Sequence, residues 1–426
     1  MRGSKPLFDK MVLVQDAPMI SSDGGLVLLR KTIERSGLMV RMASCLIDNR
    51  RQDKVRHTQL KMLCQRVVGI CLGWEDCNDF DELRNDPLYR ICLDGKPASQ
   101  PTLSTFENSV ERRELHALSR ELVQFFIERY KGKSPRRIVL DFDATDDPAH
   151  GQQELEFYHG YYGTHCYLPL LVFASVDGSA MELVGAILRP GNSHAGKRSA
   201  AVLKRMAKML RKAFPATEIV VRADAGFALP EMYAACDELE LGYVISLPKN
   251  SRLIDLSSPF QDESRAQFLA TGQKAKVFGE FGYAAESWPE ERRVIAKAEV
   301  TSKGDNPRYV VTNLDGDAEA TYNLYIARGD SENRIKELKL DLSSGRTSCH
   351  RFSANCFRLL LHAISFVLMS LVRELLAETP LARCTMHQIR IKLLKVAAIV
   401  EQSTRRILVR LPRGHPYAGL LCTLAA

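Results

Sequence analysis

The sequence lacks several features that would define a protein class at once. Its 11 cysteines are scattered singly with no CxxC pair, which argues against a zinc knuckle and a disulfide framework. It has no internal repeat, no low-complexity tract, no phosphate-cradling glycine loop and no serine-nucleophile motif. Repeat proteins, small zinc modules and hydrolases of small molecules are therefore poor candidates.

Long apolar runs are also scarce. The longest uncharged apolar stretch, Leu359 to Val372, is too short for a membrane span, and the first fifteen residues contain no sustained apolar segment. We therefore expect no membrane partner. Unpaired cysteines fit a reducing compartment, so a cytoplasmic location is expected. The hydrophobic content of 45% is that of an ordinary folded protein.

Positive charge is in modest excess and is unevenly placed. The chain has 59 Lys and Arg against 51 Asp and Glu. Beyond Pro380 it has eight basic residues and a single acid, Glu401, which suits a polyanionic partner. The alternation in 405–411 predicts an edge strand carrying Arg405, Arg406 and Arg410. That strand is either a DNA-binding surface or a cationic solvated face.

The middle of the chain predicts a mixed sheet. Up to about residue 133 the apolar periodicity is helical. Short apolar or β-branched runs then predict a three-stranded meander, followed by alternating helices and strands. The order β-β-β-α-β-α-β implies a mixed sheet covered by helices. The expected elements are strands at 137–144, 167–175, 182–188, 218–222 and 243–247, with helices at 197–214 and 230–238.

The second half predicts an insertion and further helices. Residues 249–317 alternate or are β-branched between Gly and Pro, which indicates a β-rich insertion. A helix is expected over about 319–340 and a long apolar helix over 355–376. We therefore predict an α/β fold with a helical domain (1–133), a core in two parts (134–248 and 318–345), the insertion (249–317) and a helical, basic C-terminal region (346–426).

Two predicted strands end in aspartate. Asp141 and Asp143 lie on the same side of the first strand because side chains alternate. Asp224 ends the 218–222 strand, and Gly226 indicates a tight turn directly after it. Carboxylates on a rigid scaffold are what Mg²⁺ requires. Each aspartate could instead simply cap a turn.

A third acidic residue lies in a more specific pattern. Tyr325, Arg328, Glu332 and Lys339 stand at offsets 0, 3, 7 and 14. At about 100° per residue all four share one narrow stripe of a helix. The alternative is a solvated helix face with ordinary i,i+4 ion pairs.

This stripe matches, at every position, the Tyr-x2-Arg-x3-Glu-x6-Lys (YREK) signature of bacterial insertion-sequence DDE transposases, which the chain resembles. Asp143-Ala-Thr145 and Asp224-Ala-Gly226-Phe227 look like the first and second catalytic segments of that group. The similarity extends from Asp23-Gly-Gly-Leu to Ser287-Trp288 and so covers most of the chain.

The resemblance implies an RNase H-like core in which Asp143, Asp224 and Glu332 are catalytic and bind Mg²⁺, with Mn²⁺ as a substitute. Asp141 is the main rival to Asp143. The resemblance assigns Tyr325, Arg328 and Lys339 to contacts with double-stranded DNA, both transposon ends and target. It further implies DNA cleavage and strand transfer, a homodimer in the DNA complex, an N-terminal helical domain that binds DNA, and association with the bacterial nucleoid.

Two further assignments stay open. Trp288, beside Arg292 and Arg293, either stacks on a base displaced from the duplex end or packs the core of the insertion. Between Arg50 and Arg66 a second basic cluster is expected to help recognise terminal repeats. The alternative functions are a metal-dependent nuclease without strand transfer and a domesticated DNA-binding protein without catalysis.

Overall fold

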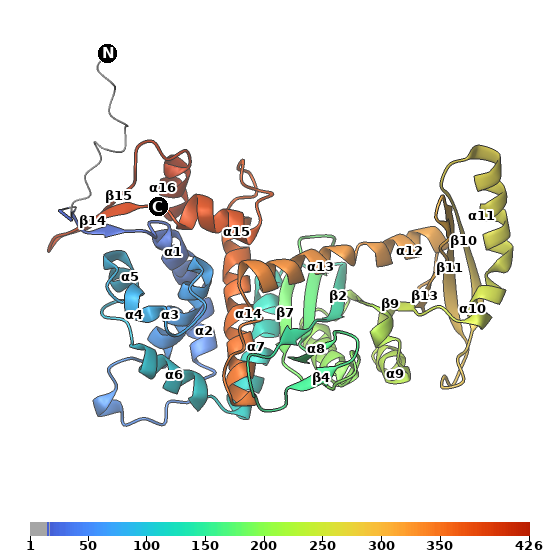
Figure 1. The fold of residues 1–426 in the computed structure, drawn as a ribbon, viewed down its shortest axis with the longest axis horizontal. Helices are drawn as coiled ribbons and strands as arrows, with labels where there is room; N and C mark the ends of the chain where they lie inside the picture. Colours follow the sequence, from blue (N-terminus) through green and yellow to red (C-terminus); the bar gives the residue numbers. More distant parts are fainter. Residues whose placement is uncertain (1–14, 17) are drawn as a thin grey trace, which may run out of the picture.

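The computed structural model describes residues 15–16 and 18–426. Figure 1 shows an elongated molecule with a helical region at one end, a central sheet and a strand-rich region at the other end. Helix α14 stands between the N-terminal helices and the sheet.

The N-terminal region is helical, as predicted. Short polar caps and glycines set its boundaries: Thr58 caps α3 by accepting from the backbone N–H of Lys61, and Gly73 ends α3 in the left-handed conformation. The helices are α1 (Leu26–Ser36), α2 (Leu38–Ala43), α3 (Gln59–Leu72), α4 (Phe80–Leu83), α5 (Pro87–Cys92), α6 (Gln100–Ser109) and α7 (Arg112–Tyr130).

The central sheet confirms the predicted mixed α/β architecture. β2 (Arg137–Ala144), β6 (Leu170–Val176) and β7 (Glu182–Ile187) form the antiparallel meander. β8 (Glu218–Ala223) pairs parallel with the other side of β2, and β9 (Gly242–Leu247) pairs parallel with β8. The spatial order β7-β6-β2-β8-β9 places the ends of β2 and β8 side by side.

Helices cover both faces of this sheet. Ile138, Leu140 and Phe142 pack with residues of α7, α8 (Ser199–Ala213) and α9 (Pro230–Glu238) on one face. Leu171 and Phe173 pack on the other face with α14 (Phe352–Glu374). Helix α14 is long and apolar enough to cross a membrane, but 83% of its most apolar window is buried within the protein. We therefore identify α14 as the core helix between two layers.

The segment 249–317 contains two helices as well as strands. α10 (Ser251–Leu256) and α11 (Ser258–Thr271) precede β10 (Ala275–Tyr283), β11 (Arg292–Thr301), β12 (Gly304–Asp305) and β13 (Arg308–Thr312). The prediction of a purely strand-rich segment missed these helices. Asn250 caps α10, and Gly272 ends α11 with a positive φ. β13 pairs with β9, so the segment extends the central sheet to nine strands.

The expected single helix over 319–340 is divided into three parts. α12 (Ala318–Ile326) and α13 (Gly329–Lys336) run end to end along the sheet in Figure 1, with a turn at Ala327 and Arg328. The wider π-helical turn η4 (Glu337–Asp341) follows directly. Helix α12 packs near β9 to β11, whereas η4 reaches the residues of α14.

The basic C-terminal segment returns to the N-terminal helices. After α15 (Met386–Ile389) and the π-helical turn η5 (Arg390–Leu394), β14 (Ala398–Gln402) and β15 (Ile407–Arg410) form an antiparallel hairpin, and α16 (Ala418–Ala425) follows. The predicted strand is present at Ile407–Arg410 and carries Arg410, whereas Arg405 and Arg406 lie in the turn before it and not on the strand. β14 also pairs with β1 (Ile20–Ser21), so the early and late parts of the described chain share one small sheet.

Candidate active site

The two aspartates of β2 have different environments. Asp141 is fully buried and accepts two hydrogen bonds from the Arg222 guanidinium, at 2.8 and 2.7 Å. Arg222 is itself buried and lies on the neighbouring strand β8, opposite Asp141 in the register. The pair compensates both buried charges. Asp141 is therefore a structural partner of Arg222, and Asp143 is left as the reactive candidate.

Asp143 and Asp224 lie at adjacent strand ends. Asp143 is 7% exposed, and Asp224 directly follows β8. Asp224 caps the turn of η3 (Ala225–Phe227) by accepting from the Gly226 N–H at 2.8 Å. Burial raises the pKa of Asp143 to about 6; Arg328 opposes this shift, and the negative charge of Asp224 adds to it. Because Phe142 and Ala223, the residues before the two aspartates, are paired in register, both carboxylates lie at the same edge of the sheet.

The predicted stripe is spread over α12, the turn at Ala327 and Arg328, α13 and η4, and Arg328 in that turn contacts Asp143. Arg328 Nη1 donates to Asp143 Oδ2 at 2.6 Å, and its Nη2 donates to Glu332 Oε1 at 3.2 Å. Arg328 is largely buried, whereas 55% of the Glu332 side chain is exposed. Tyr325 lies one turn earlier and contacts Tyr322 edge-on with ring centres 6.0 Å apart. One guanidinium therefore joins the strand-borne and the helix-borne acids.

Lys339 is anchored to the chain just beyond β2. Its Nζ donates to Asp146 Oδ1 at 2.7 Å and to Thr145 Oγ1 at 3.2 Å. No local sequence signal marks Asp146 as the partner of a lysine 193 residues away. Asp147, next in the chain, is buried with Oδ1 unpartnered, and burial raises its pKa to about 7.

The site offers oxygen donors of the kind that a divalent cation takes. Asp143 and Asp224 supply hard oxygen donors whose mutual repulsion a cation would relieve. Glu332 is held by Arg328 and is mostly exposed. Within residues 15–16 and 18–426, no three His, Cys, Asp or Glu side chains form a group that could hold a metal ion as they stand. The aspartate pair fits a cation, and Glu332 would join it only after Arg328 moves.

The residues of the insertion that were predicted to contact DNA are instead engaged in contacts within the protein. Trp288 is half-buried and packs edge-on against Tyr233 and Tyr283, with ring centres 5.0 and 5.5 Å away. Arg292 is buried and pairs with Asp237 and Glu290 at 2.7 and 2.8 Å. Arg293 pairs with Glu280. These side chains are occupied in holding β10, β11 and α9 together.

The C-terminal cations divide into free and engaged groups. Arg405 and Arg406 are exposed and form no ion pair with any residue that the structure describes. Arg410, on the same hairpin, pairs with Glu401 at 2.8 Å. In the N-terminal cluster, Arg66 is fully buried beside Glu107. Arg66 therefore does not belong to a basic surface, whereas Arg405 and Arg406 remain available.

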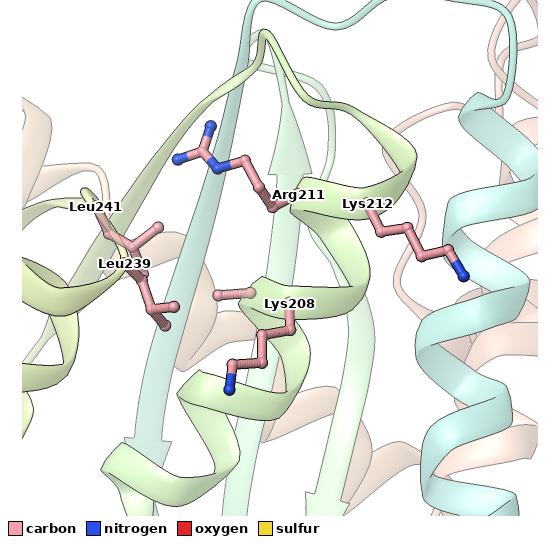
Figure 2. A pocket seen from close by; sticks show the side chains of 6 residues that line it. Lys208, Arg211, Lys212, Leu239 and Leu241 are labelled. Atoms are coloured by element: carbon pink, nitrogen blue, oxygen red, sulfur yellow. The ribbon is translucent and has the colours of Figure 1, made fainter.

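A shallow pocket of about 240 Å³ lies at the last turn of α8, away from the carboxylates. Figure 2 shows its apolar floor, Leu239 and Leu241, with Lys212 pointing away from it. Arg211 is engaged with the backbone carbonyl of Thr217 at 2.7 Å. No acidic side chain lines this pocket, so it lacks the groups that the candidate chemistry needs.

Fold and site together define an α/β protein with two aspartates at adjacent strand ends and a glutamate on a facing helix, joined through Arg328. The chain belongs to the family described as Transposase DDE domain group 1, whose profile matches residues 5–426. The protein is therefore a transposase by family.

Two solved structures resemble this chain at low sequence identity. One is the Mos1 transposase paired-end complex with the left transposon end, at 14% identity, and another is the Mos1 mariner paired-end complex with Mn, at 12% identity. Both cover 46% of this chain and 65% of their own, each with a TM-score of 0.17. At that score we base no argument on the likeness. No curated protein matches the sequence.

Proposed function

We propose that this protein is the transposase of a bacterial insertion sequence that carries the YREK signature. It would bind double-stranded DNA at the terminal inverted repeats, cleave it and transfer the freed 3′ end to target DNA. The observation that carries this proposal is the contact of Arg328 with both Asp143 and Glu332 beside Asp224. In this arrangement residues from three separate segments meet at one edge of the sheet.

The catalytic core is proposed to be RNase H-like. The strand order β7-β6-β2-β8-β9, antiparallel only on the β6 side of β2, supports this assignment. We further propose that 1–133 is a DNA-binding domain, that 134–248 and 318–345 form the core around the insertion 249–317, and that 346–426 is a C-terminal extension.

Asp143, Asp224 and Glu332 would hold Mg²⁺, with Mn²⁺ as a substitute. When bound, the ions activate the attacking oxygen and stabilise the leaving 3′ oxygen. The protein's contribution is positional. β2 and β8 fix two carboxylates on paired strands, and α13 brings the third within reach of the Arg328 guanidinium. Burial at the end of β2 keeps the Asp143 carboxylate sparsely hydrated, so it favours a cation over water.

The proposed DNA contacts are made by cations beside the carboxylates and on the C-terminal hairpin, of which Arg328, Lys339 and Arg410 would exchange a carboxylate partner for a phosphate. We propose that Arg328 and Lys339, with Tyr325, contact phosphates near the scissile bond, and that Arg405, Arg406 and Arg410 contact the flanking duplex. Trp288, Arg292 and Arg293 are left out of this proposal because they are engaged inside the protein. Strand transfer of two ends requires two active sites, so we propose a homodimer on DNA, in the cytoplasm at the nucleoid.

The test uses a labelled duplex made from the repeats that flank the coding sequence in its natural DNA. With Mg²⁺, wild type should release a 3′ end, whereas Asp143→Asn, Asp224→Asn and Glu332→Gln should each lower cleavage by at least about 100-fold. Asp255→Asn, an exposed aspartate on α10, is the matched control. Cleavage retained in all three site variants would end the proposal.

A second assay separates transposition from plain nuclease action. Precut ends are supplied with a plasmid target, and joined products are measured. Joining by wild type is expected. Cleavage of intact ends without any joining of precut ends would favour the nuclease without strand transfer, and duplex binding without cleavage would favour the domesticated DNA-binding protein.

A further inference from the structure

An exposed aromatic hairpin projects from the chain directly after the reactive end of β2. β4 (Phe157–His159) and β5 (Thr164–Tyr167) pair antiparallel, and β3 (Asp147–Pro148) joins β5. Its outer side chains are unusually apolar for a surface: Tyr161 is 86% exposed and Tyr158 59% exposed. Isolated exposed hydrophobics are common, but three aromatics on one short hairpin, with Phe157 the third, form a surface suited to a flat ligand.

The hairpin lies beside the candidate active site. Asp147, which lies four residues after Asp143 in the chain, pairs in register with Tyr167 of β5. The rings of Tyr161 and Tyr162 contact edge-on with centres 5.0 Å apart. The charges of Asp146, Asp143 and Asp224 all act on Tyr162, whose pKa is raised, mainly by burial, to about 12. Tyr162 therefore packs within the hairpin, between His159 and the exposed Tyr161.

A cationic loop, residues 191–198, closes the other side. Gly191 lies so close to the hairpin that an added Cβ would sit 1.9 Å from the Cys166 carbonyl oxygen. At its other end the loop touches the Asp224 turn, since a Cβ on Gly226 would lie 2.7 Å from the Ala195 Cβ. Lys197 and Arg198 are exposed and form no ion pair with the residues that the structure describes.

A buried arginine holds this loop in place. Arg189 is 4% exposed and donates to the carbonyl oxygens of Leu168, Ala195 and Lys197, at 2.8, 2.5 and 3.1 Å. Its Nη2 has no hydrogen-bond partner, and no carboxylate of the described chain pairs with it. A buried cation compensated only by carbonyls is costly, and it leaves positive potential beneath the loop.

We propose that the hairpin and the loop together form a binding site for an unpaired nucleotide next to the scissile bond. The base would stack on Tyr161, flanked by Tyr158, and its phosphate would contact Lys197 and Arg198. This inference rests on the proposed function, because it names the part of the DNA substrate that the active site admits.

The chemistry favours a nucleotide over other occupants. The hairpin supplies exposed aromatic faces and the adjoining loop supplies free cations, and this combination matches a base followed by a phosphate. A purely apolar partner would leave Lys197 and Arg198 without counter-charges, whereas an acidic peptide would leave the exposed rings unused. The adjacent carboxylates repel phosphate, so a bound divalent ion or the cations of the loop must offset them.

The test compares two duplexes with the same terminal repeat, one blunt and one with a short single-stranded flank that contains 2-aminopurine. Wild type, without metal, should bind the flanked duplex more tightly and quench 2-aminopurine by stacking. Tyr161→Ala should weaken binding of the flanked duplex about tenfold and remove the quenching, and Tyr161→Phe should restore both. Leu269→Ala, an 83% exposed residue on α11, is the matched control.

The outcomes separate this inference from the proposed function. If wild type binds neither duplex, the proposed function fails and the inference fails with it. If wild type binds both duplexes but Tyr161→Ala and Tyr158→Ala leave quenching and the flanked-to-blunt ratio unchanged, only the inference is overturned. An equal loss of affinity for both duplexes in Tyr161→Ala also overturns it, because the hairpin would then contact paired DNA.

Discussion

Arg328 contacts Asp143 with one guanidinium nitrogen and Glu332 with another, and it thereby takes the place between them that a shared cation would need. Removing the guanidinium leaves buried Asp143 beside Asp224 without its nearest cation. We expect Arg328→Ala to lower stability in EDTA by about 1–3 kcal/mol. We also expect Mg²⁺ to raise the melting temperature of this variant more than that of wild type, because no guanidinium has to be displaced.

Thermal unfolding in EDTA and in Mg²⁺ measures both effects. Arg265→Ala is the control, since it removes an exposed arginine that pairs with Asp305 within the insertion. An identical Mg²⁺-induced shift in wild type and Arg328→Ala would contradict competition between the guanidinium and the metal.

Asp141 and Arg222 allow a test of whether the Asp141 carboxylate serves the fold or the reaction. Asp141→Leu leaves Arg222 buried and unpaired, which should destabilise the protein by about 3 kcal/mol. The double variant Asp141→Leu/Arg222→Met replaces both charges and should recover most of that loss. Denaturant unfolding measures the free energy of unfolding of wild type and both variants. DNA cleavage by the double variant then shows whether the Asp141–Arg222 pair is needed for the reaction. Recovered folding with no cleavage would mean that Asp141 also serves the reaction.

Asp147 predicts a pH-dependent stability. Its pKa is raised to about 7 by burial, so the folded protein disfavours the ionised form. Below about pH 4 the carboxyl is protonated in both folded and unfolded chains; between that pH and 7 only the unfolded chain ionises freely. Wild type should therefore lose stability relative to Asp147→Asn as pH rises from 4 to 8, by at most about 4 kcal/mol.

The comparison uses urea unfolding at pH 5 and pH 8. Asp255→Asn serves as the exposed control and should follow wild type at both values. A constant difference between wild type and Asp147→Asn across this range would show that the ionisation of Asp147 does not enter the stability.

The C-terminal hairpin predicts a salt effect on DNA binding. Arg405 and Arg406 are exposed and free of ion pairs within the described chain, so each can neutralise a phosphate. Arg405→Ser/Arg406→Ser should reduce the slope of log affinity against log salt by about 2. Arg410→Ser should change the slope less, because Arg410 already pairs with Glu401. Fluorescence anisotropy at several salt concentrations measures all three proteins, and an unchanged slope in the double variant would place DNA elsewhere.

Much of the core could be predicted from local pattern. β2, β6, β7, β8 and β9 all appear where short apolar runs are predicted, because burial on both faces demands such runs; β6 and β8 are followed by Asp and β9 by Pro248. The stripe of Arg328, Glu332 and Lys339 was predicted from helical periodicity. It survives the turn at Ala327 and the π-helical turn η4, since Arg328 and Lys339 both reach the end of β2.

Other features depend on partners far away in the sequence. Asp141 and Asp143 look alike locally, and only Arg222 on the adjacent strand distinguishes them. Arg390 was grouped with the basic tail, but it is largely buried and donates to the Cys71 and Ile70 carbonyls, some 320 residues earlier. The helices α10 and α11 did have local signals, the Asn250 cap and Gly272, which the β-branched residues around them outweighed.

The pairing of β13 with β9 has a mechanical consequence. Four successive residue pairs, from Tyr309 with Leu247 to Thr312 with Val244, bind the outer strands to the strand beside β8. No hinge separates the far edge of the sheet from the strand that ends at Asp224. A force applied at β10 therefore travels through backbone hydrogen bonds to β8, so the outer strands can move relative to Asp224 only if the twist of the sheet changes.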